Sequence, residues 1–390
     1  MGIEGRSRES ADKRVRLGMV GGGEGAFIGA VHRLAARMDD HYTFVAGALS
    51  STPDKAKRSG AALGLAPDRI YSDYEAMAKA EAKRPDGIEA VSIVTPNHMH
   101  APVAKAFLKA GIHVICDKPL TTTLKEAQSL QKAAAASKAI FAVTYNYTGY
   151  PMVRHARTMI EGGELGELRV VQVEYPQDWL TERLEATGQK QAAWRTDPKQ
   201  SGAGGCIGDI GTHAYDLASF VSGLTLDSLS ADLTSFVKGR KLDDNVHIMM
   251  RFKGGAKGML WASQVAPGNE NGLRLRIYGT KGGLTWEQQH PNHLTWAPFG
   301  QPPRTITRGG HGANEAAARV TRVPPGHPEG YLEGFANLYT EIAAAIRAAR
   351  NGKKPDAAVT FPTVADGVRG VAFVEAAVKS SKKNGAWVKV

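Results

Sequence analysis

The chain has 390 residues, of which 42% are apolar and only two are cysteines, and its formal net charge is +11. No apolar run approaches the roughly 20 residues that span a bilayer, and two cysteines cannot form a disulfide framework, so we expect a cytoplasmic protein without a membrane partner. The basic residues are dispersed and no long run of them is interleaved with aromatics, which argues against nucleic acid as a partner.

Along the first part of the chain, short apolar strands alternate with helical stretches. Residues 1–13 are polar and predict a flexible tail, and residues 14–148 predict a dinucleotide-binding Rossmann domain, an α/β fold with a doubly wound parallel sheet. The expected strands are 15–20, 44–49, 90–94, 112–116 and 140–143, and the expected helices are 30–38, 53–63, 101–110 and 124–136.

A glycine-rich loop follows the first strand and precedes a helix. In that context backbone N–H groups at a helix N-terminus bind phosphate, although an ordinary tight turn is the alternative. Gly21 and Gly23 fit the first two positions of the G-x-G-x-x-G pattern, but Ala26 stands at the third, which indicates a lengthened loop. We expect Gly21, Gly23, Phe27 and Ile28 to contact a dinucleotide.

Polar residues follow several of the expected strands. Ser50, Thr95 and Lys118 all lie at carboxyl ends, where ligands of such sheets bind, so one site should collect them. An acid after the second strand would bind the adenosine ribose and favour NAD, but this chain has none there. Serines in this place, with Lys55 or Arg58 nearby, would suit a 2'-phosphate, so these residues leave NAD and NADP open.

The pattern changes in residues 149–390, which predict a second, substrate-binding domain. Runs of alternating apolar residues favour a large, open, mainly antiparallel sheet in a C-terminal α/β domain. These runs are 168–174, 227–236, 246–252, 256–263 and 273–278. A long loop is expected at 300–328, because it is rich in Gly, Pro and Arg, followed by a helix at 331–349.

Three residues form the predicted catalytic set. Lys118 ends a short strand, and Asp209 and His213 lie four residues apart at an expected helix start, where they would share one face. Alcohol oxidation needs a group that takes the hydroxyl proton, and a neutral imidazole has a suitable pKa. Asp209 would orient the ring of His213, and Lys118 would bond the same substrate oxygen. The rival interpretation is a metal site that includes His98 and His100, but no cysteine or glutamate cluster completes it, so no metal is expected.

Several motifs in register resemble the Gfo/Idh/MocA oxidoreductases. They are residues 95–100 (TPNHMH), 117–119 (DKP) and 209–216 (DIGTHAYD). The resemblance implies an NAD(P)-dependent dehydrogenase that oxidises a secondary alcohol of a cyclic polyol or sugar (an inositol, a free pyranose or a glycoside) to a ketone or lactone. NAD is the first choice of cofactor and NADP is possible. The resemblance also implies a homo-oligomer, a dimer or tetramer, in which a partner covers the other face of the sheet, so that residues 149–390 are also the oligomerisation domain.

The resemblance adds residues to the site. Asn97, His100 and Asp117, together with Lys118, are expected at the cofactor, and Tyr147, Arg195 and His327, together with Lys118, Asp209 and His213, are expected at the substrate. Asp117 stands where the family has glutamate, and Thr148 where it often has arginine. Two alternatives stay open: a glycosidase-like enzyme that oxidises a sugar transiently with bound NAD, and a non-catalytic nucleotide-binding sensor.

Overall fold

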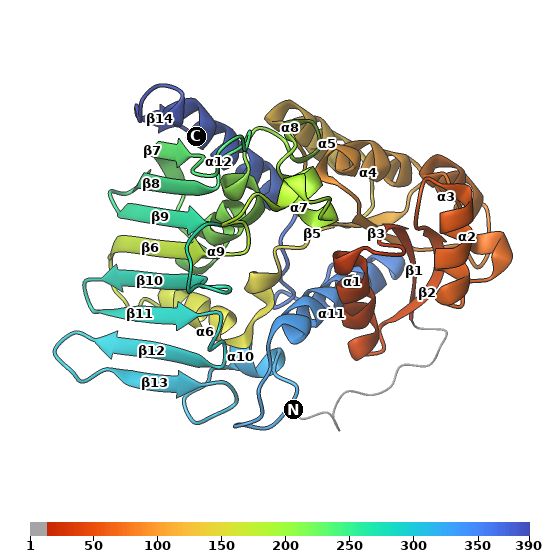
Figure 1. Cartoon of the computed structure of the whole chain (residues 1–390). Helices are drawn as coiled ribbons and strands as arrows, with labels where there is room; N and C mark the ends of the chain where they lie inside the picture. The colour runs from red at the N-terminus through yellow and green to blue at the C-terminus, as the bar shows by residue number, and fades with distance from the viewer. Residues whose placement is uncertain (1–13) are drawn as a thin grey trace.

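The computed structural model describes residues 14–390, so the tail predicted at residues 1–13 lies outside the described residues. Two sheets lie side by side with helices packed between and around them (Figure 1). One sheet has five strands and the other has nine. No helix within residues 14–390 is long and apolar enough to cross a membrane.

The first sheet is parallel throughout, with the order β2-β1-β3-β4-β5, which confirms the predicted Rossmann fold. Its strands are β1 (Val15–Gly21), β2 (Tyr42–Ala48), β3 (Ala90–Val94), β4 (His113–Cys116) and β5 (Phe141–Val143). The helices between them are α1 (Phe27–Met38), α2 (Pro53–Ala62), α3 (Tyr74–Glu81), α4 (His100–Lys109) and α5 (Leu124–Ala136). Every residue of β3 is buried, as expected for a central strand that is covered on both faces. Helix α1 begins three residues before its predicted start, and α3 was not predicted.

The second sheet has the order β13-β12-β11-β10-β6-β9-β8-β7-β14 and is antiparallel except where β6 meets β9. Its strands are β6 (Leu168–Pro176), β7 (Leu226–Thr234), β8 (Asn245–Phe252), β9 (Lys257–Ser263), β10 (Arg274–Gly279), β11 (Gly282–Glu287), β12 (His293–Pro298), β13 (Arg304–Thr307) and β14 (Val388–Lys389). The predicted long loop at 300–328 is wrong in part, because it contains β13 and the short helix α10 (Glu315–Arg319).

Helices cover one face of this second sheet. They are α6 (Pro151–Glu161), α9 (Thr212–Ser222) and α12 (Val364–Ser381), which lie between the two sheets (Figure 1). Strand β8 shows the alternation that results: Val246 and Ile248 are buried against these helices, whereas His247 and Met249 point to the other side and are exposed.

Helix α11 (Tyr331–Arg350) comes late in the chain but packs on the first sheet. Phe335 and Ile342 belong to the same buried cluster as Leu17 of β1. The hydroxyl of Tyr339 lies 2.8 Å from Nδ1 of His32 in α1. The late helix therefore completes the core of the nucleotide-binding half.

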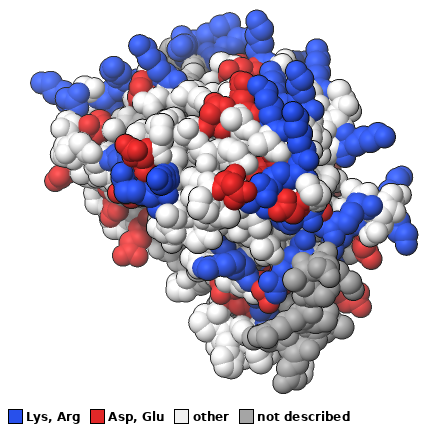
Figure 2. Space-filling view, turned by 90° about the vertical axis from the view of Figure 1, so that its right-hand side faces the viewer, with Lys and Arg blue, Asp and Glu red and all other residues white. Residues whose placement is uncertain are grey.

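The outer face of this half carries many charges. Figure 2 shows lysine and arginine side chains along its upper edge with acidic side chains among them. Arg84, for example, is paired with Asp68 at 2.8 Å and with Asp86 at 2.9 Å. Neighbouring opposite charges therefore partly neutralise one another on this face.

Candidate active site

A cavity of about 1060 Å³ lies between the two halves, at the carboxyl ends of the parallel strands. It collects most of the predicted site residues. Those that line it are Gly21, Gly23, Phe27, Ile28, Ser50, Thr95, Asn97, Asp117, Lys118, Tyr147, Arg195, Asp209 and His213. The sheet edge therefore gathers side chains that are far apart in sequence, as the carboxyl-end rule predicts.

Glycines shape the cofactor end of the cavity. Gly21 has a φ of 81°, and a Cβ there would lie 2.8 Å from the carbonyl oxygen of Val94. In α1, a Cβ on Gly29 would lie 2.4 Å from Cα of Gly22, so only glycine lets the helix approach the loop this closely. Gly29 thus occupies the place of the third glycine of the dinucleotide pattern, which the chain reaches three residues later than Ala26.

The same end offers groups that fit a dinucleotide. Helix α1 has no side-chain cap at Ala26, so its amino end keeps backbone N–H groups available to an anion. Thr95 lines the cavity with a buried hydroxyl that lacks a partner within residues 14–390. Ser50 and Lys55 also line the cavity, and no acidic residue lies between β2 and α2. These residues would hold the pyrophosphate and ribose of a nicotinamide dinucleotide.

Lys118 follows β4 and points across to the second half of the chain. The carboxylate of Asp117 accepts hydrogen bonds from the backbone N–H of Lys118 at 2.8 Å and from the hydroxyl of Thr144 at 3.0 Å. Nζ of Lys118 donates to the backbone oxygen of Asp209 at 2.7 Å and to its Oδ1 at 3.0 Å. An ammonium group has three N–H bonds, so one remains for a ligand in the cavity.

Asp209 lies in a π-helical turn, η7 (Ile207–Gly211), that leads into α9. Such turns are rare and often occur at functional sites. The carboxylate of Asp243 fixes the entry to this turn by accepting from the N–H groups of Gly205 at 2.7 Å and Ile207 at 2.8 Å. Burial raises the pKa of Asp243 to about 6, although these two hydrogen bonds favour the ionised form. The sequence had indicated an ordinary helix start here.

Three side chains surround the carboxylate of Asp209, and the ring of His213 is not hydrogen-bonded to it. Besides Lys118, Oδ2 lies 3.3 Å from Nε of Arg195 and accepts from Nε2 of Gln264 at 3.0 Å. Burial alone would raise the pKa of Asp209, but Lys118 and Arg195 outweigh it and hold the pKa well below its ordinary value. Asp209 is thus a permanent anion that anchors two cations.

His213 sits in an aromatic cage. Its ring makes edge contacts with Tyr147 and Tyr145, with centroids 5.0 and 5.7 Å apart. Its Nδ1 is buried and has no partner within residues 14–390. Burial and the charge of Lys118 lower the pKa of His213 well below 6.5, so the ring is neutral at pH 7. The expectation that Asp209 orients this ring is therefore wrong: aromatic packing orients it.

Two predicted site residues lie outside the cavity. The ring nitrogens of His100 are 2.8 Å from the carbonyl oxygen of Pro119 and 2.9 Å from that of Thr95, so His100 supports two loops from behind. His327 is exposed on the loop before α11, and its carbonyl oxygen accepts a hydrogen bond from Arg308. The packing of these loops keeps both rings away from the cavity of this chain.

Other residues of the site were missed from the sequence. Tyr175 lies near the end of β6, Gln177 comes directly after this strand, and Asn271 lies in the loop before β10; all three line the cavity. Gln264 follows β9 and reaches Asp209. Their position near strand ends was the only signal, because none belongs to a recognised motif.

Comparisons with known proteins agree with this geometry. Residues 15–145 match the model of an oxidoreductase family with an NAD-binding Rossmann fold, and residues 153–285 match that of the GFO/IDH/MocA C-terminal domain. The chain is 36% identical to the uncharacterized oxidoreductase YfiI of Bacillus subtilis, covering 96% of this chain and 97% of the relative. It is 28% identical to a levoglucosan dehydrogenase of Pseudarthrobacter phenanthrenivorans, covering 97% and 98%.

Solved structures show the same likeness. A crystal structure of an oxidoreductase from Sinorhizobium meliloti is 61% identical, with a TM-score of 0.89 and coverage of 96% of this chain and 99% of that one. An inositol dehydrogenase homolog from Azotobacter vinelandii, complexed with NADH and myo-inositol, is 38% identical, with a TM-score of 0.90 and coverage of 97% and 98%. The chain belongs to the Gfo/Idh/MocA family and is an NAD(P)-dependent oxidoreductase that acts on CH–OH groups, with an NAD-binding Rossmann domain.

Proposed function

We propose that this protein is a dehydrogenase that oxidises a secondary alcohol of a cyclic polyol or sugar to a ketone or lactone. One observation carries the proposal: the cavity holds a lysine with one N–H to spare beside a neutral, buried imidazole. A nicotinamide dinucleotide whose phosphates are held at the glycine loop would supply the hydride acceptor. Lys118 supplies a hydrogen-bond donor for the substrate oxygen, and His213 supplies an acceptor for its proton.

The two residues divide the proton chemistry. Lys118 donates its remaining N–H to the substrate oxygen and stabilises the negative charge that develops on it as the C–H bond breaks. His213 takes the hydroxyl proton and becomes an imidazolium. Asp209 compensates that new charge through space, since its own pKa keeps it ionised, and it holds Lys118 in place. Tyr147 and Arg195 line the same cavity and are proposed to contact the substrate.

The substrate class rests on relatives and on the polar lining. An inositol dehydrogenase homolog was crystallised with myo-inositol, and a levoglucosan dehydrogenase is similar over nearly the whole chain. Ring polyols and pyranoses share adjacent hydroxyls on a rigid ring, which suits a cavity lined by tyrosine, amide and arginine side chains. We name inositols, free pyranoses and glycosides as the candidate substrates.

A substrate panel tests the proposal. Purified protein is mixed with NAD or NADP and each inositol, sugar or glycoside, and reduced cofactor is measured together with product. Stoichiometric NADH and ketone or lactone are expected. Glycoside cleavage without net NADH would favour the glycosidase-like alternative, and cofactor binding without turnover of any panel member would favour the sensor.

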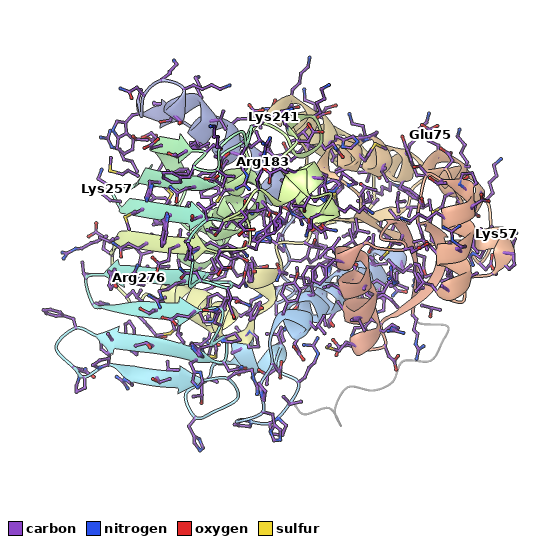
Figure 3. The ribbon with its side chains drawn as sticks, viewed as in Figure 1. Lys57, Glu75, Arg183, Lys241, Lys257 and Arg276 are labelled. Atoms are coloured by element: carbon purple, nitrogen blue, oxygen red, sulfur yellow. The ribbon has the colours of Figure 1, made fainter. Side chains whose placement is uncertain are left out.

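We also propose a homo-oligomer, a dimer or tetramer, in the cytoplasm. The helix-free face of the second sheet exposes Val170, Met249 and Met259, and a second copy of this sheet would bury them. Figure 3 shows Arg276 and Lys257 on strands of this sheet; Arg276 is paired with Glu174 at 3.4 Å, and the charge of Lys257 would need a partner in such a contact. Cys116 and Cys206 are buried and unbridged, which fits a reducing compartment. Light scattering of the purified protein tests the assembly.

A further inference from the structure

A chain of side-chain hydrogen bonds forms one wall of the cavity. The hydroxyls of Tyr147 and Tyr175 lie 2.5 Å apart, and the hydroxyl of Tyr175 donates to Oδ1 of Asn271 at 2.8 Å. Nε2 of Gln177 donates to the same oxygen at 2.8 Å, and Nδ2 of Asn271 donates to Oε1 of Gln288 at 2.8 Å. The chain thus runs from the ring of Tyr147, beside His213, to Gln288, which directly follows β11.

The partners fix the direction of each hydrogen bond. An amide oxygen only accepts, so the single proton of the Tyr175 hydroxyl is committed to Asn271. The Tyr175 oxygen can then only accept from Tyr147, whose own single proton is committed in turn. Tyr147 is 4% exposed and lines the cavity, and with its proton committed its oxygen has only a lone pair to offer a ligand there.

We propose that Tyr175 and Asn271 make Tyr147 an obligatory hydrogen-bond acceptor, and that this wall selects a substrate with a donor group, a free hydroxyl or an ammonium, next to the carbon that reacts at His213. The inference rests on the proposed function and adds a rule for the neighbouring position. An ether oxygen, a fluorine or a carbonyl oxygen at that position has no proton to donate. Its lone pairs would face those of the Tyr147 oxygen, and the contact would be repulsive. Tyr175 and Asn271 act through Tyr147 and are positioning residues.

The magnitude of the selection follows from burial. A buried polar atom that loses its partner costs the desolvation of that atom, and sites built to bond a hydroxyl reject analogues that lack the donor. We expect at least about a tenfold loss of kcat/KM or affinity when the donor is replaced by a fluorine of nearly the same size. An amino group, which donates as an ammonium, should retain binding.

Analogues of myo-inositol provide the test. The probes are myo-inositol, its monodeoxyfluoro derivatives and its monoamino-deoxy derivatives, assayed for NADH formation and for binding to the NADH-loaded protein by calorimetry. In the wild-type protein, one fluoro position should be disfavoured at least tenfold while the amino group at that position is accepted. Equal acceptance of every fluoro analogue would contradict the proposal.

Variants locate the cause of the selection. Tyr175→Phe frees the Tyr147 proton, so the gap between hydroxyl and fluoro probes should shrink several-fold, with the change mainly in KM. Asn271→Leu should do the same, whereas Asn271→Asp keeps an acceptor for Tyr175 and should preserve the gap. Tyr150→Phe is the matched control, because its hydroxyl accepts from Gln288 at 3.4 Å at the remote end of the chain. An unchanged gap in both Tyr175→Phe and Asn271→Leu would overturn the inference.

The readouts separate this inference from the proposed function. If the hydroxyl and amino probes bind better than the fluoro probe but no NADH forms, the proposed dehydrogenation of these probes is contradicted and the selection by Tyr147 is supported. If myo-inositol is oxidised and no analogue is discriminated against, only the proposed selection by Tyr147 is contradicted. Failure of every probe to bind the NADH-loaded protein would contradict both.

Discussion

The two ends of the cavity are built in different ways. The cofactor end is made largely of backbone: Gly21, Gly22 and Gly29 bring β1, its loop and α1 into contact within one continuous stretch of chain. The substrate end is made of side chains from separate strands and loops, with Asp209 and Asn271 as its hubs. A backbone site depends on shape and on glycine, whereas a side-chain site depends on single atoms and their protons.

This contrast predicts the largest effect at the substrate end. Replacement of Lys118 or His213 by alanine should lower kcat by about 10²-fold or more, the usual scale of acid–base help, while NADH affinity changes little. Steady-state kinetics and NADH titration of both variants check this. Near-normal turnover in both variants would remove these residues from the chemistry.

The pH profile sharpens the same assignment. Because the pKa of His213 is held well below 6.5 by burial and by Lys118, the free enzyme already has a neutral base at pH 6. Its titration should therefore not raise kcat/KM between about pH 6 and 9, whereas an ordinary exposed imidazole would titrate in or near this range. In Lys118→Met the pKa of His213 should rise, because a positive neighbour is gone. The residual activity should therefore begin to fall at a higher pH on acidification than it does in the wild type. An acid limb in the same place in both proteins would contradict the coupling.

The cofactor end should respond to pH through stability. Burial lowers the pKa of His32, on α1, to about 4. The folded state then binds fewer protons than the unfolded state, so this contribution is intact above about pH 6.5 and is lost as pH falls toward 4, by about 3 kcal/mol. Denaturant unfolding between about pH 6.5 and 4 should show this loss. In His32→Gln the free energy of unfolding should depend less steeply on pH. An identical slope in the variant would exclude His32 as a source.

A change of one methyl group tests the glycine contact. Gly29→Ala places a Cβ 2.4 Å from Cα of Gly22, so we expect a loss of about 1–3 kcal/mol in stability and weaker NADH binding. Ala30→Leu adds more volume on the exposed side of the same helix and is the control. Thermal unfolding and NADH titration of both proteins measure the difference, and equal effects would mean that the loop adapts.

The smallest effect concerns the adenosine ribose. Ser50→Asp places a charge at the end of β2, where it should repel a 2'-phosphate and accept from a 2'-hydroxyl. The ratio of kcat/KM for NADP to that for NAD should fall several-fold. The value of kcat/KM is measured with each cofactor in the wild type and in the variant. An unchanged ratio would place the ribose away from Ser50.

Local pattern predicted most of the strands and helices of the cofactor half, although it missed α3. The bounds of β3 and α5 match their prediction, and Gly21, Thr95 and Lys118 line one cavity, because strand order and the carboxyl-end rule place them there. Asp209 and His213, which belong to one motif, line the same cavity. These features depend on neighbours in sequence or on a sheet topology that few alternatives satisfy.

Only the tertiary structure decided how the side chains of the substrate half are arranged. Asp209 binds Lys118, Arg195 and Gln264 and leaves the ring of His213 to its aromatic cage, because a π-helical turn held by Asp243 sets its direction. The pKa of His213 is set by burial, and the tyrosine chain exists because β6 and the loop before β10 meet at the cavity. Desolvation and proton direction depend on every group packed around an atom, and those groups come from segments whose spacing in the sequence carries no such signal.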